Sequence, residues 1–378
     1  MIKNVLTYLV KRYNCKKFTF VCLAVLIALL LLPHHLIHSK SNLNEHYFIP
    51  EDAFKVLELK FPSTEWIEEQ SGAGLAWHES YRIMAYIAMY VGTEDTTYLK
   101  KAIHRIDKVL EVRDDKRKIT DDIRSRIVPA WCSTKYTNGK NYAWIVHAGM
   151  ITYPIIRCAY LINQDKDLQK LYGKKAEKYI QAVEETIHGY ESEWRETNKT
   201  GEGWYYGDYN KRCIPLNQQN AFGRTILMLW LITGKKEYLN KATKLATYFK
   251  NCLIPKKNYY LWLTWGSYGK VADISHAAIS VDFAYICYDS GVVFSKHDLD
   301  CFVNTFKNCI RKDGFSEFID GKGNLKLSVE MGRWAHLIYI DYNIRQYLMS
   351  YFDKHWFKNY RTTFLALAYL VETENMFK

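Results

Sequence analysis

A helical hairpin of roughly 60 residues recurs along the chain, and this repeat restricts the possible folds more than any other feature of the sequence. Its clearest copy has an apolar helix over 221–232, a turn at 233–236 and an amphipathic helix over 238–252. A helix that is apolar on all sides is buried, whereas a helix with one apolar stripe lies outside. Neither helix can bury its apolar surface alone, so the copies must stack on one another.

Further copies are expected on both sides of this one. We predict helix pairs at 80–91 with 97–112, at 142–162 with 168–187, at 274–289 with 296–310, and a last pair at about 331–352 with 361–372. Short strands are expected in the loops around 259–265. Repeated inner and outer helices predict an all-α fold, either a curved solenoid or a closed ring of inner helices wrapped by outer ones.

The N-terminal segment is predicted to be a membrane anchor and not part of this fold. Basic residues precede an apolar run from Phe18 to Leu32, and Leu36-Ile37 extends it to about the length that crosses a bilayer. No small-residue cleavage site follows, and the basic flank should remain in the cytoplasm. We therefore expect a cytoplasmic tail and signal anchor over 1–38, a linker and lead-in segment over 39–76, and a helical domain over 77–378 that is luminal, periplasmic or extracellular.

Two further observations bear on the compartment and the partners. A cleaved signal peptide and a secreted protein are the alternative to the anchor, and the sequon Asn198-Lys199-Thr200 is compatible with a glycoprotein. The net charge of +12 is scattered over predicted outer helices, which does not indicate a nucleic-acid surface. It would attract an acidic polysaccharide. No metal-ligand spacing, phosphate-binding glycine loop or dinucleotide motif occurs, so neither a metal nor a cofactor is expected.

The repeat also resembles a known superfamily. The segment Asn217–Arg224, followed by Leu231–Leu239 and Ala242, resembles the helical hairpins of the six-hairpin glycosidase-like, alpha/alpha toroid carbohydrate enzymes, and Tyr86–Tyr98 looks like the same unit. The likeness covers roughly residues 77–372. It implies a toroid of about five to six hairpins. The superfamily includes uronate polysaccharide lyases, the helical domain of glucuronyl C5-epimerases, sugar epimerases and several glycoside hydrolases, so the resemblance implies a glycan ligand without fixing the reaction.

Polar side chains recur near the start of each inner helix. His78, His147, Gln219 and His276 lie 14 to 16 residues before the turn that ends their helix. Residues at equal distance from the turn should lie at equal depth in the ring, and inner-helix starts converge on one mouth. Unpaired N–H groups and a partial positive charge at these starts favour bound carboxylates. We therefore predict that these positions mark a common cleft.

Residue types at the helix starts favour proton abstraction from an acidic glycan, as in a lyase or C5-epimerase. The predicted acid/base groups are His276 and His147, with Tyr205, Tyr206 and Asp273 as further catalytic candidates. The predicted substrate-binding residues are Asn217, Gln219, Asn220, Arg333, His78 and Glu330, with Trp131, Trp144, Trp204 and Trp265 for stacking on sugar rings.

Two alternatives remain open at this stage. A glycoside hydrolase needs two carboxyl groups, for which Asp208, Asp273, Asp282 and Glu330 are the candidates. A non-catalytic glycan-binding or scaffold protein could use the same concave surface. His276 could also be a core histidine bonded to a loop carbonyl, and Arg333 a simple partner of Glu330.

Overall fold

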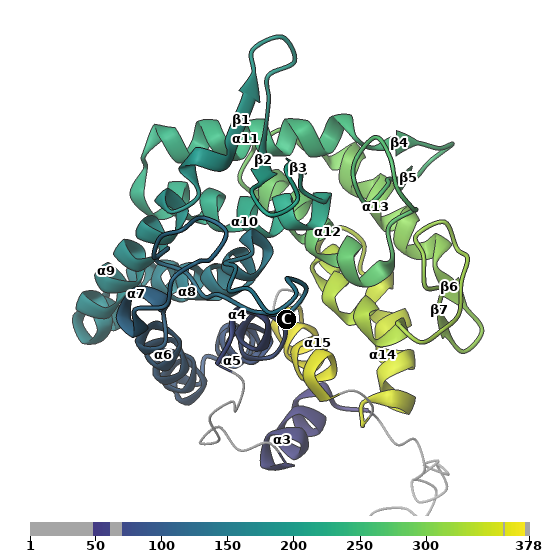
Figure 1. The fold of residues 1–378 in the computed structure, drawn as a ribbon. Coiled ribbons are helices and arrows are strands. Elements are labelled where there is room, and N and C mark those ends of the chain that lie inside the picture. Colours follow the sequence, from purple (N-terminus) through teal and green to yellow (C-terminus); the bar gives the residue numbers. More distant parts are fainter. Residues whose placement is uncertain (1–47, 61–69, 358–359, 375–378) are drawn as a thin grey trace, which may run out of the picture. The chain divides into compact units, whose positions relative to one another are not determined.

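Six inner helical segments form a closed ring in the computed structural model (Figure 1). The structure describes residues 48–60, 70–357 and 360–374, which belong to one unit, Phe48–Lys378. In chain order the inner segments are α5 (Ser80–Thr93), α8 (Ile145–Gln164), α10 (Leu216–Thr233), α12 (Ile274–Asp289), the 3-10 helix η4 (Ser328–Tyr339) and α15 (Tyr360–Glu372). Each packs on the next, and α15 packs on α5 and closes the ring.

An outer helix accompanies each inner segment. These are α6 (Thr96–Glu111), α9 (Lys166–His188), α11 (Lys236–Asn251), α13 (Lys296–Asn308), α14 (Asn343–His355) and α3 (Pro50–Lys60). The outer helix α3 packs against α15, so the sixth pair is made from the two ends of the described chain. The four predicted pairs between residues 80 and 310 are confirmed, with bounds that differ by a few residues at most.

The prediction for the last pair, 331–352 with 361–372, is wrong about where its helices begin and end. The segment 331–352 is not one helix, because it contains the inner η4 and the outer α14, and 361–372 is the sixth inner helix. The break falls at Asp341, whose side chain accepts a hydrogen bond from the N–H of Asn343 at 3.0 Å. Such a local side-chain bond offers the backbone a turn in place of a continuing helix. The apolar periodicity runs through this turn and hides it.

The predicted anchor over 1–38 lies outside the described residues. Within the described ranges, only α8 has the length and apolar composition of a membrane-crossing helix, and 83% of its most apolar window is buried inside the protein. Pro154 lies within this helix. By its place in the ring, α8 is a core helix.

Short elements connect the helices. They are α4 (Gly72–Gly74), the π-helix η2 (Leu75–Glu79), α7 (Asp114–Arg117) and the 3-10 helix η3 (Glu191–Glu193), and the strand pairs β4 (Ile254–Pro255) with β5 (Tyr260–Leu261) and β6 (Ile310–Arg311) with β7 (Gly314–Phe315). The short strand expected near 259–265 is thus present as β5.

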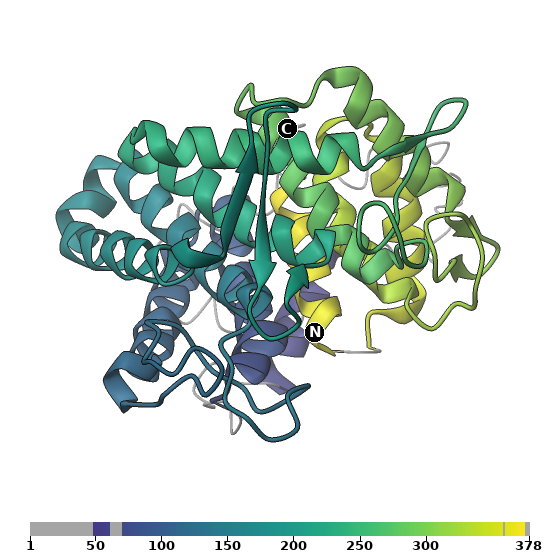
Figure 2. The ribbon, with the colours of Figure 1, turned by 45° about the horizontal axis from the view of Figure 1, so that its top comes forward.

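A three-stranded antiparallel sheet was not predicted. It consists of β1 (Trp194–Thr197), β2 (Glu202–Gly207) and β3 (Arg212–Cys213), and β2 packs against the outer helix α11 (Figure 2). The aromatic residues Trp204, Tyr205 and Tyr206 are part of β2. Its residues alternate between buried and half-buried, as expected for a strand with one covered face.

Buried charges join five of the six inner segments. Asp282 of α12 binds Arg224 of α10 and His336 of η4, each at 2.6 Å. On the other side of His336, Glu372 of α15 lies 3.9 Å from Nε2 and pairs with Arg157 of α8. Charges removed from water are stable only when paired and hydrogen-bonded. Asp282 is therefore a structural partner in the wall of the ring.

Candidate functional site

The leading ends of four inner helices and the middle of η4 meet at one open cavity of about 430 Å³. Its lining comprises Trp77, Tyr81, Tyr136, Trp144, Val146, His147, Asn210, Arg212, Pro215, Asn217, Gln218, Trp265, Ser275, His276, Ile279 and Arg333. These residues come from the start of α5 and the preceding η2, from the starts of α8, α10 and α12, from η4, and from the loops between them. The predicted convergence of inner-helix starts on one hollow is therefore observed.

His276 stands at the start of α12 and is held by the residue that begins the helix. Asp273 caps α12 by accepting the N–H groups of Ser275 and His276 through Oδ1, both at 3.0 Å. Its other oxygen, Oδ2, lies 2.5 Å from Nδ1 of His276. Burial opposes ionisation of Asp273, but the imidazole and the helix-start N–H groups outweigh it and lower the pKa of this carboxyl. One carboxylate thus fixes both the helix start and the ring orientation.

His147 lies at the start of α8, where its surroundings differ from those of His276. Its side chain is buried against the edge of Trp77, with the ring centroids 5.8 Å apart. Burial lowers the pKa of His147 to about 3, and Lys135 adds to this effect. Its Nδ1 has no hydrogen-bond partner among the described residues. His147 is therefore a neutral imidazole at physiological pH, on an inner helix separated from His276 by α10.

The Arg333 guanidinium lines the cavity but is already paired. It donates to Glu330 Oε2 at 3.0 Å and to the Ser275 carbonyl at 3.1 Å, and it lies 4.9 Å from the ring centre of Tyr81. Glu330 also accepts from Thr362 at 3.0 Å and does not line the cavity. Arg333 and Glu330 are thus a buried ion pair in the cavity wall, so most of the charge of Arg333 is balanced within the protein.

Aromatic side chains form much of the cavity surface. Trp144 packs edge-on against Tyr142 and Tyr209, and Trp265 stacks with Tyr268 at 5.7 Å between ring centres. Trp77, Tyr81 and Tyr136 complete the aromatic part of the lining. Of the four predicted stacking tryptophans, Trp144 and Trp265 therefore have the required position.

The other two tryptophans and the two tyrosines lie elsewhere. Trp131 is in the core, where its indole N–H donates to the Val109 carbonyl at 3.0 Å. Trp204, Tyr205 and Tyr206 belong to β2, and none of them lines the cavity. Tyr205 is completely buried against Phe222, and the Tyr206 hydroxyl donates to the Lys211 carbonyl. Tyr205 faces the inner helix α10, whereas Trp204 packs on Tyr248 of the outer helix α11. These positions do not fit the catalytic or stacking roles predicted for the three residues.

The amides at the start of α10 divide in the same way. Asn217 lines the cavity, whereas Gln219 is buried and binds β2, with Oε1 accepting the Tyr205 N–H at 2.8 Å. Asn220 donates to Ser280 Oγ at 2.9 Å and joins α10 to α12. Gln218, which was not predicted, lines the cavity, and its buried Oε1 has no partner among the described residues. Gln219 and Asn220 therefore tie elements together and do not face a ligand.

His78 also misses the cavity. The π-helix η2 changes the helical register before α5, and Trp77 and Tyr81 face the hollow in its place. His78 instead contacts Arg361 of α15. Successive helical residues are rotated by about 100°, so counting to within one or two residues gives the depth of a side chain but not its direction. This also explains why Gln218 and not Gln219 lines the cavity.

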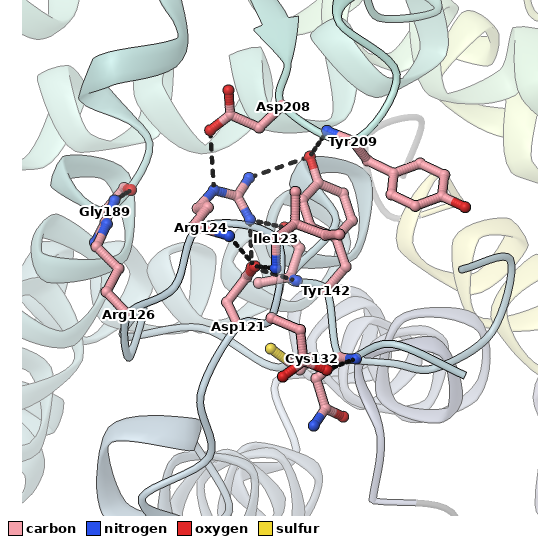
Figure 3. Close-up of polar contacts among 12 residues, drawn as sticks. Asp121, Ile123, Arg124, Arg126, Cys132, Tyr142, Gly189, Asp208 and Tyr209 are labelled. Carbon is pink, nitrogen blue, oxygen red and sulfur yellow. Dashed lines mark hydrogen bonds and ion pairs between the residues drawn. The ribbon is translucent and has the colours of Figure 1, made fainter. Parts of the chain in front are cut away.

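A buried cluster of polar contacts surrounds Arg124, next to the loops that line the cavity (Figure 3). Arg124 donates to Asp121 at 2.5 Å and to Glu193 at 2.7 Å, and its Nε lies 3.9 Å from Asp208. The Tyr142 hydroxyl accepts from Arg124 and from the Tyr209 N–H, both at 3.3 Å. Burial raises the pKa of Glu193 to about 7, although Arg124 opposes this shift. The cluster holds the loop that carries Tyr136 and Trp144 against the loop that carries Asn210.

The charged side chains that line the cavity are all positive. None of its lining residues is an aspartate or glutamate, and two of them are arginines. In the described part of the chain, no group of three or more His, Cys, Asp or Glu residues has a geometry that could hold a metal ion. The lining can therefore offer imidazoles, amides, indoles and guanidinium groups to a ligand.

Searches with the sequence find no matching family profile and no matching curated protein. Solved structures do match. The alpha-1,6-mannanase GH76A of a Salegentibacter species, an inactive variant in complex with alpha-1,6-mannotetrose, is 11% identical with a TM-score of 0.57, and the match covers 88% of this chain and 100% of that one. A D-mannose isomerase is 12% identical with a TM-score of 0.55, over 86% and 97%.

A family 76 glycoside hydrolase from a bovine Bacteroides thetaiotaomicron strain is 13% identical with a TM-score of 0.52, over 87% of this chain and 76% of that one. At such low identity these likenesses show the fold. This chain has the six-hairpin glycosidase-like alpha/alpha toroid fold, as the resemblance of its hairpins implied.

Proposed function

We propose that the cavity binds a glycan and that His276 transfers a proton to or from it. The observation that carries this proposal is the Asp273–His276 pair, with 2.5 Å between Oδ2 and Nδ1, on the surface of an open cavity with aromatic walls. A carboxylate bonded to one ring nitrogen sets the tautomer and leaves the other nitrogen for proton transfer. His276 is about half exposed, so this nitrogen is accessible to a ligand.

His147 supplies a second imidazole on the same cavity. Because burial lowers its pKa to about 3, it stays neutral and can donate or accept a hydrogen bond without carrying charge. Because His147 carries no proton to give up at neutral pH, His276 would remove the proton from the sugar carbon. In an isomerisation His276 would return that proton to the neighbouring carbon, and in an epimerisation the new proton would come from water on the other face. With a single proton removal and loss of a leaving group, the same pair would support a lyase.

The chemistry of the lining supports an acidic glycan. Arginines and neutral amides can bind a carboxylate, whereas a lining without carboxylates does not repel one. Apolar indole faces pack on sugar rings. Because of this lining, we propose that the ligand is an acidic glycan. We propose that the reaction is that of a lyase or a C5-epimerase.

A glycoside hydrolase is the second candidate, and the fold comparison favours it. Two of the three similar structures described above are glycoside hydrolases, and none is a uronate lyase. One of them is an inactive mannanase variant in which two consecutive aspartates are replaced. Consecutive aspartates occur in the described part of this chain at 114–115 and 121–122, but none of the four lines the cavity. A fold shared at this distance hosts several chemistries, so the site must decide.

Product analysis separates these possibilities. The purified full-length chain is incubated with a polyuronate and, separately, with alpha-1,6-mannan. A new carbon–carbon double bond seen by ultraviolet absorbance identifies a lyase, and incorporation of solvent deuterium without chain cleavage identifies an epimerase. Reducing ends without unsaturation identify a hydrolase.

The variant His276→Ala tests the assigned group. Turnover should fall about 10²- to 10⁴-fold while the melting temperature stays close to that of the wild type. His104→Ala, an exposed position on α6, is the matched control and should keep full turnover. If the wild type binds a glycan without turning it over, the protein is a non-catalytic glycan-binding protein and not an enzyme. Full turnover by His276→Ala would contradict the proposed role.

A further inference from the structure

Arg212 is a cavity residue to which the sequence drew no attention. It is the first residue of β3, pairs with Gly207 of β2, and its side chain is exposed and lines the cavity. Its guanidinium lies 4.0 Å from the ring centre of Trp265, which stacks on Tyr268 on the loop before α12. The cation is thus fixed against an aromatic face at the mouth of the hollow.

Arg212 differs from Arg333 in how its charge is balanced. Arg333 is buried and paired with Glu330 at 3.0 Å. Over the described ranges, Arg212 forms no ion pair, and its side chain contacts the indole of Trp265. The neighbouring Lys211 is 3.5 Å from Asp208 and does not line the cavity. Among the cavity arginines, Arg212 is therefore the one whose charge remains for a ligand.

Contact with the indole leaves hydrogen-bond donors of Arg212 for a ligand. The guanidinium carbon lies 4.0 Å from the ring centre, and the N–H groups of a guanidinium form a planar fork. That fork matches a carboxylate or another oxyanion in a two-point hydrogen bond. The cavity holds no carboxylate to compete for it.

We propose that Arg212, held against Trp265, binds an anionic substituent of the glycan and makes the site selective for charged over neutral chains. This inference rests on the proposed function, since it assumes that a glycan occupies the cavity. The recognised chemistry is an oxyanion on a sugar ring, either the carboxylate of a uronate or a sulfate ester. Arg212 acts in binding, on the β3 side of the cavity, and takes no part in proton transfer.

The surrounding neutral groups fit the same ligand. Three amide side chains line the cavity near the same loops, those of Asn210, Asn217 and Gln218. An amide oxygen can accept a hydrogen bond from a sugar hydroxyl, and an amide N–H can donate one. Hydroxyls would thus be bound by amides while the oxyanion is bound by Arg212.

The test compares Arg212→Gln with the wild type by titration calorimetry on the full-length chain. The ligands are a uronate oligosaccharide, a sulfated neutral oligosaccharide and an uncharged mannose oligosaccharide of equal length. The variant should lose about tenfold to hundredfold in affinity for the charged ligand, because a hydrogen bond to a charged group is lost. Affinity for the uncharged ligand should change less than about twofold. Whichever of the two charged ligands shows the loss identifies the anion.

Three controls make the outcome decisive. Lys211→Gln removes a charge from the adjacent residue and should leave all affinities unchanged. Arg212→Lys keeps the charge without the fork and should recover part of the loss. Added salt should weaken charged-ligand binding more for the wild type than for Arg212→Gln. Melting temperatures confirm that each variant is folded.

Two contrary results are distinguishable. If the wild type binds a charged glycan and Arg212→Gln binds it equally well, or loses charged and uncharged ligands alike, the role of Arg212 is overturned while the proposed function stands. If the wild type binds none of the three glycans, the proposed function fails and this inference fails with it.

Discussion

At the residue scale, the Asp273–His276 pair combines a structural and a chemical task. Asp273 begins α12 as its cap and also orients the imidazole at 2.5 Å. The spacing of three residues makes this possible, because the cap oxygens lie beside the first helical turn. The sequence could indicate this pair, since an aspartate followed three residues later by a histidine at the start of an apolar helix is visible without coordinates.

Replacing Asp273 with asparagine separates the two tasks. Asparagine caps a helix about as well as aspartate, so the melting temperature should change little. The ring of His276 loses its charged partner, and turnover should fall by up to about 10⁴-fold, as when an orienting carboxylate is replaced by an amide. Thermal unfolding and product formation are measured on the same preparation. Unchanged turnover at unchanged stability would show that Asp273 serves only as a cap.

Other residues show what counting along the sequence cannot predict about the position of a side chain. His147 and His276 were predicted by their depth in the ring and do line the cavity, while His78 and Gln219 at similar depth do not. The difference is a rotation of about 100° for each residue along a helix. Local register, including the π-helix at 75–79, decides which way a side chain points, and no periodicity in the sequence reports it.

At the element scale, close approach of neighbouring inner helices depends on small residues. A Cβ on Gly149 of α8 would lie 2.6 Å from the backbone carbon of Ala221 and the nitrogen of Phe222 in α10. That distance is impossible without moving a helix, so glycine is required where the two backbones touch. The starts of these helices carry His147 and Asn217, and their separation therefore sets part of the cavity width.

Two glycine-to-alanine changes test this packing. Gly149→Ala should lower the free energy of unfolding by about 1–3 kcal/mol through overpacking. Gly173→Ala in the outer helix α9 is the control, because its Cβ would lie 3.6 Å from the Gln169 side chain, an ordinary contact. That change should raise the free energy of unfolding by about 0.5–1 kcal/mol through helix propensity. Denaturant titration measures both, and equal effects would refute the close-approach argument.

At the scale of the whole described unit, buried charges link inner segments that are far apart in sequence. His336 lies between Asp282 and Glu372, and these join α12, η4 and α15. Burial opposes protonation of His336, but the two carboxylates outweigh it and raise its pKa to about 9. His336 is therefore a cation at neutral pH, and its charge is needed to balance the carboxylates around it.

The stability of the ring should depend on pH for this reason. The folded pKa of about 9 exceeds the ordinary histidine value of 6.5, so the stabilisation is complete below pH 6.5 and is lost as the pH rises through 9. Denaturant unfolding between pH 6 and 10 measures this loss.

Two variants identify the group. Asp282→Asn should lower the free energy of unfolding by about 3–5 kcal/mol at pH 7, because it leaves buried cations without their partner, and should reduce the pH dependence. Asp300→Asn, at an exposed ion pair on α13, should do neither. If Asp282→Asn kept the wild-type pH profile, His336 would not be its source.

The amino-acid sequence alone determined the four helical hairpins between residues 80 and 310 with their inner and outer members, because these follow from apolar periodicity and turn residues within each segment. It also predicted that inner-helix starts converge on one hollow. Tertiary structure decided the rest. The sixth pair joins α15 to α3, and Arg212 meets Trp265 from another loop, 53 residues on. Such contacts depend on ring closure and side-chain rotation, which are set by packing between segments and leave no local pattern in the chain.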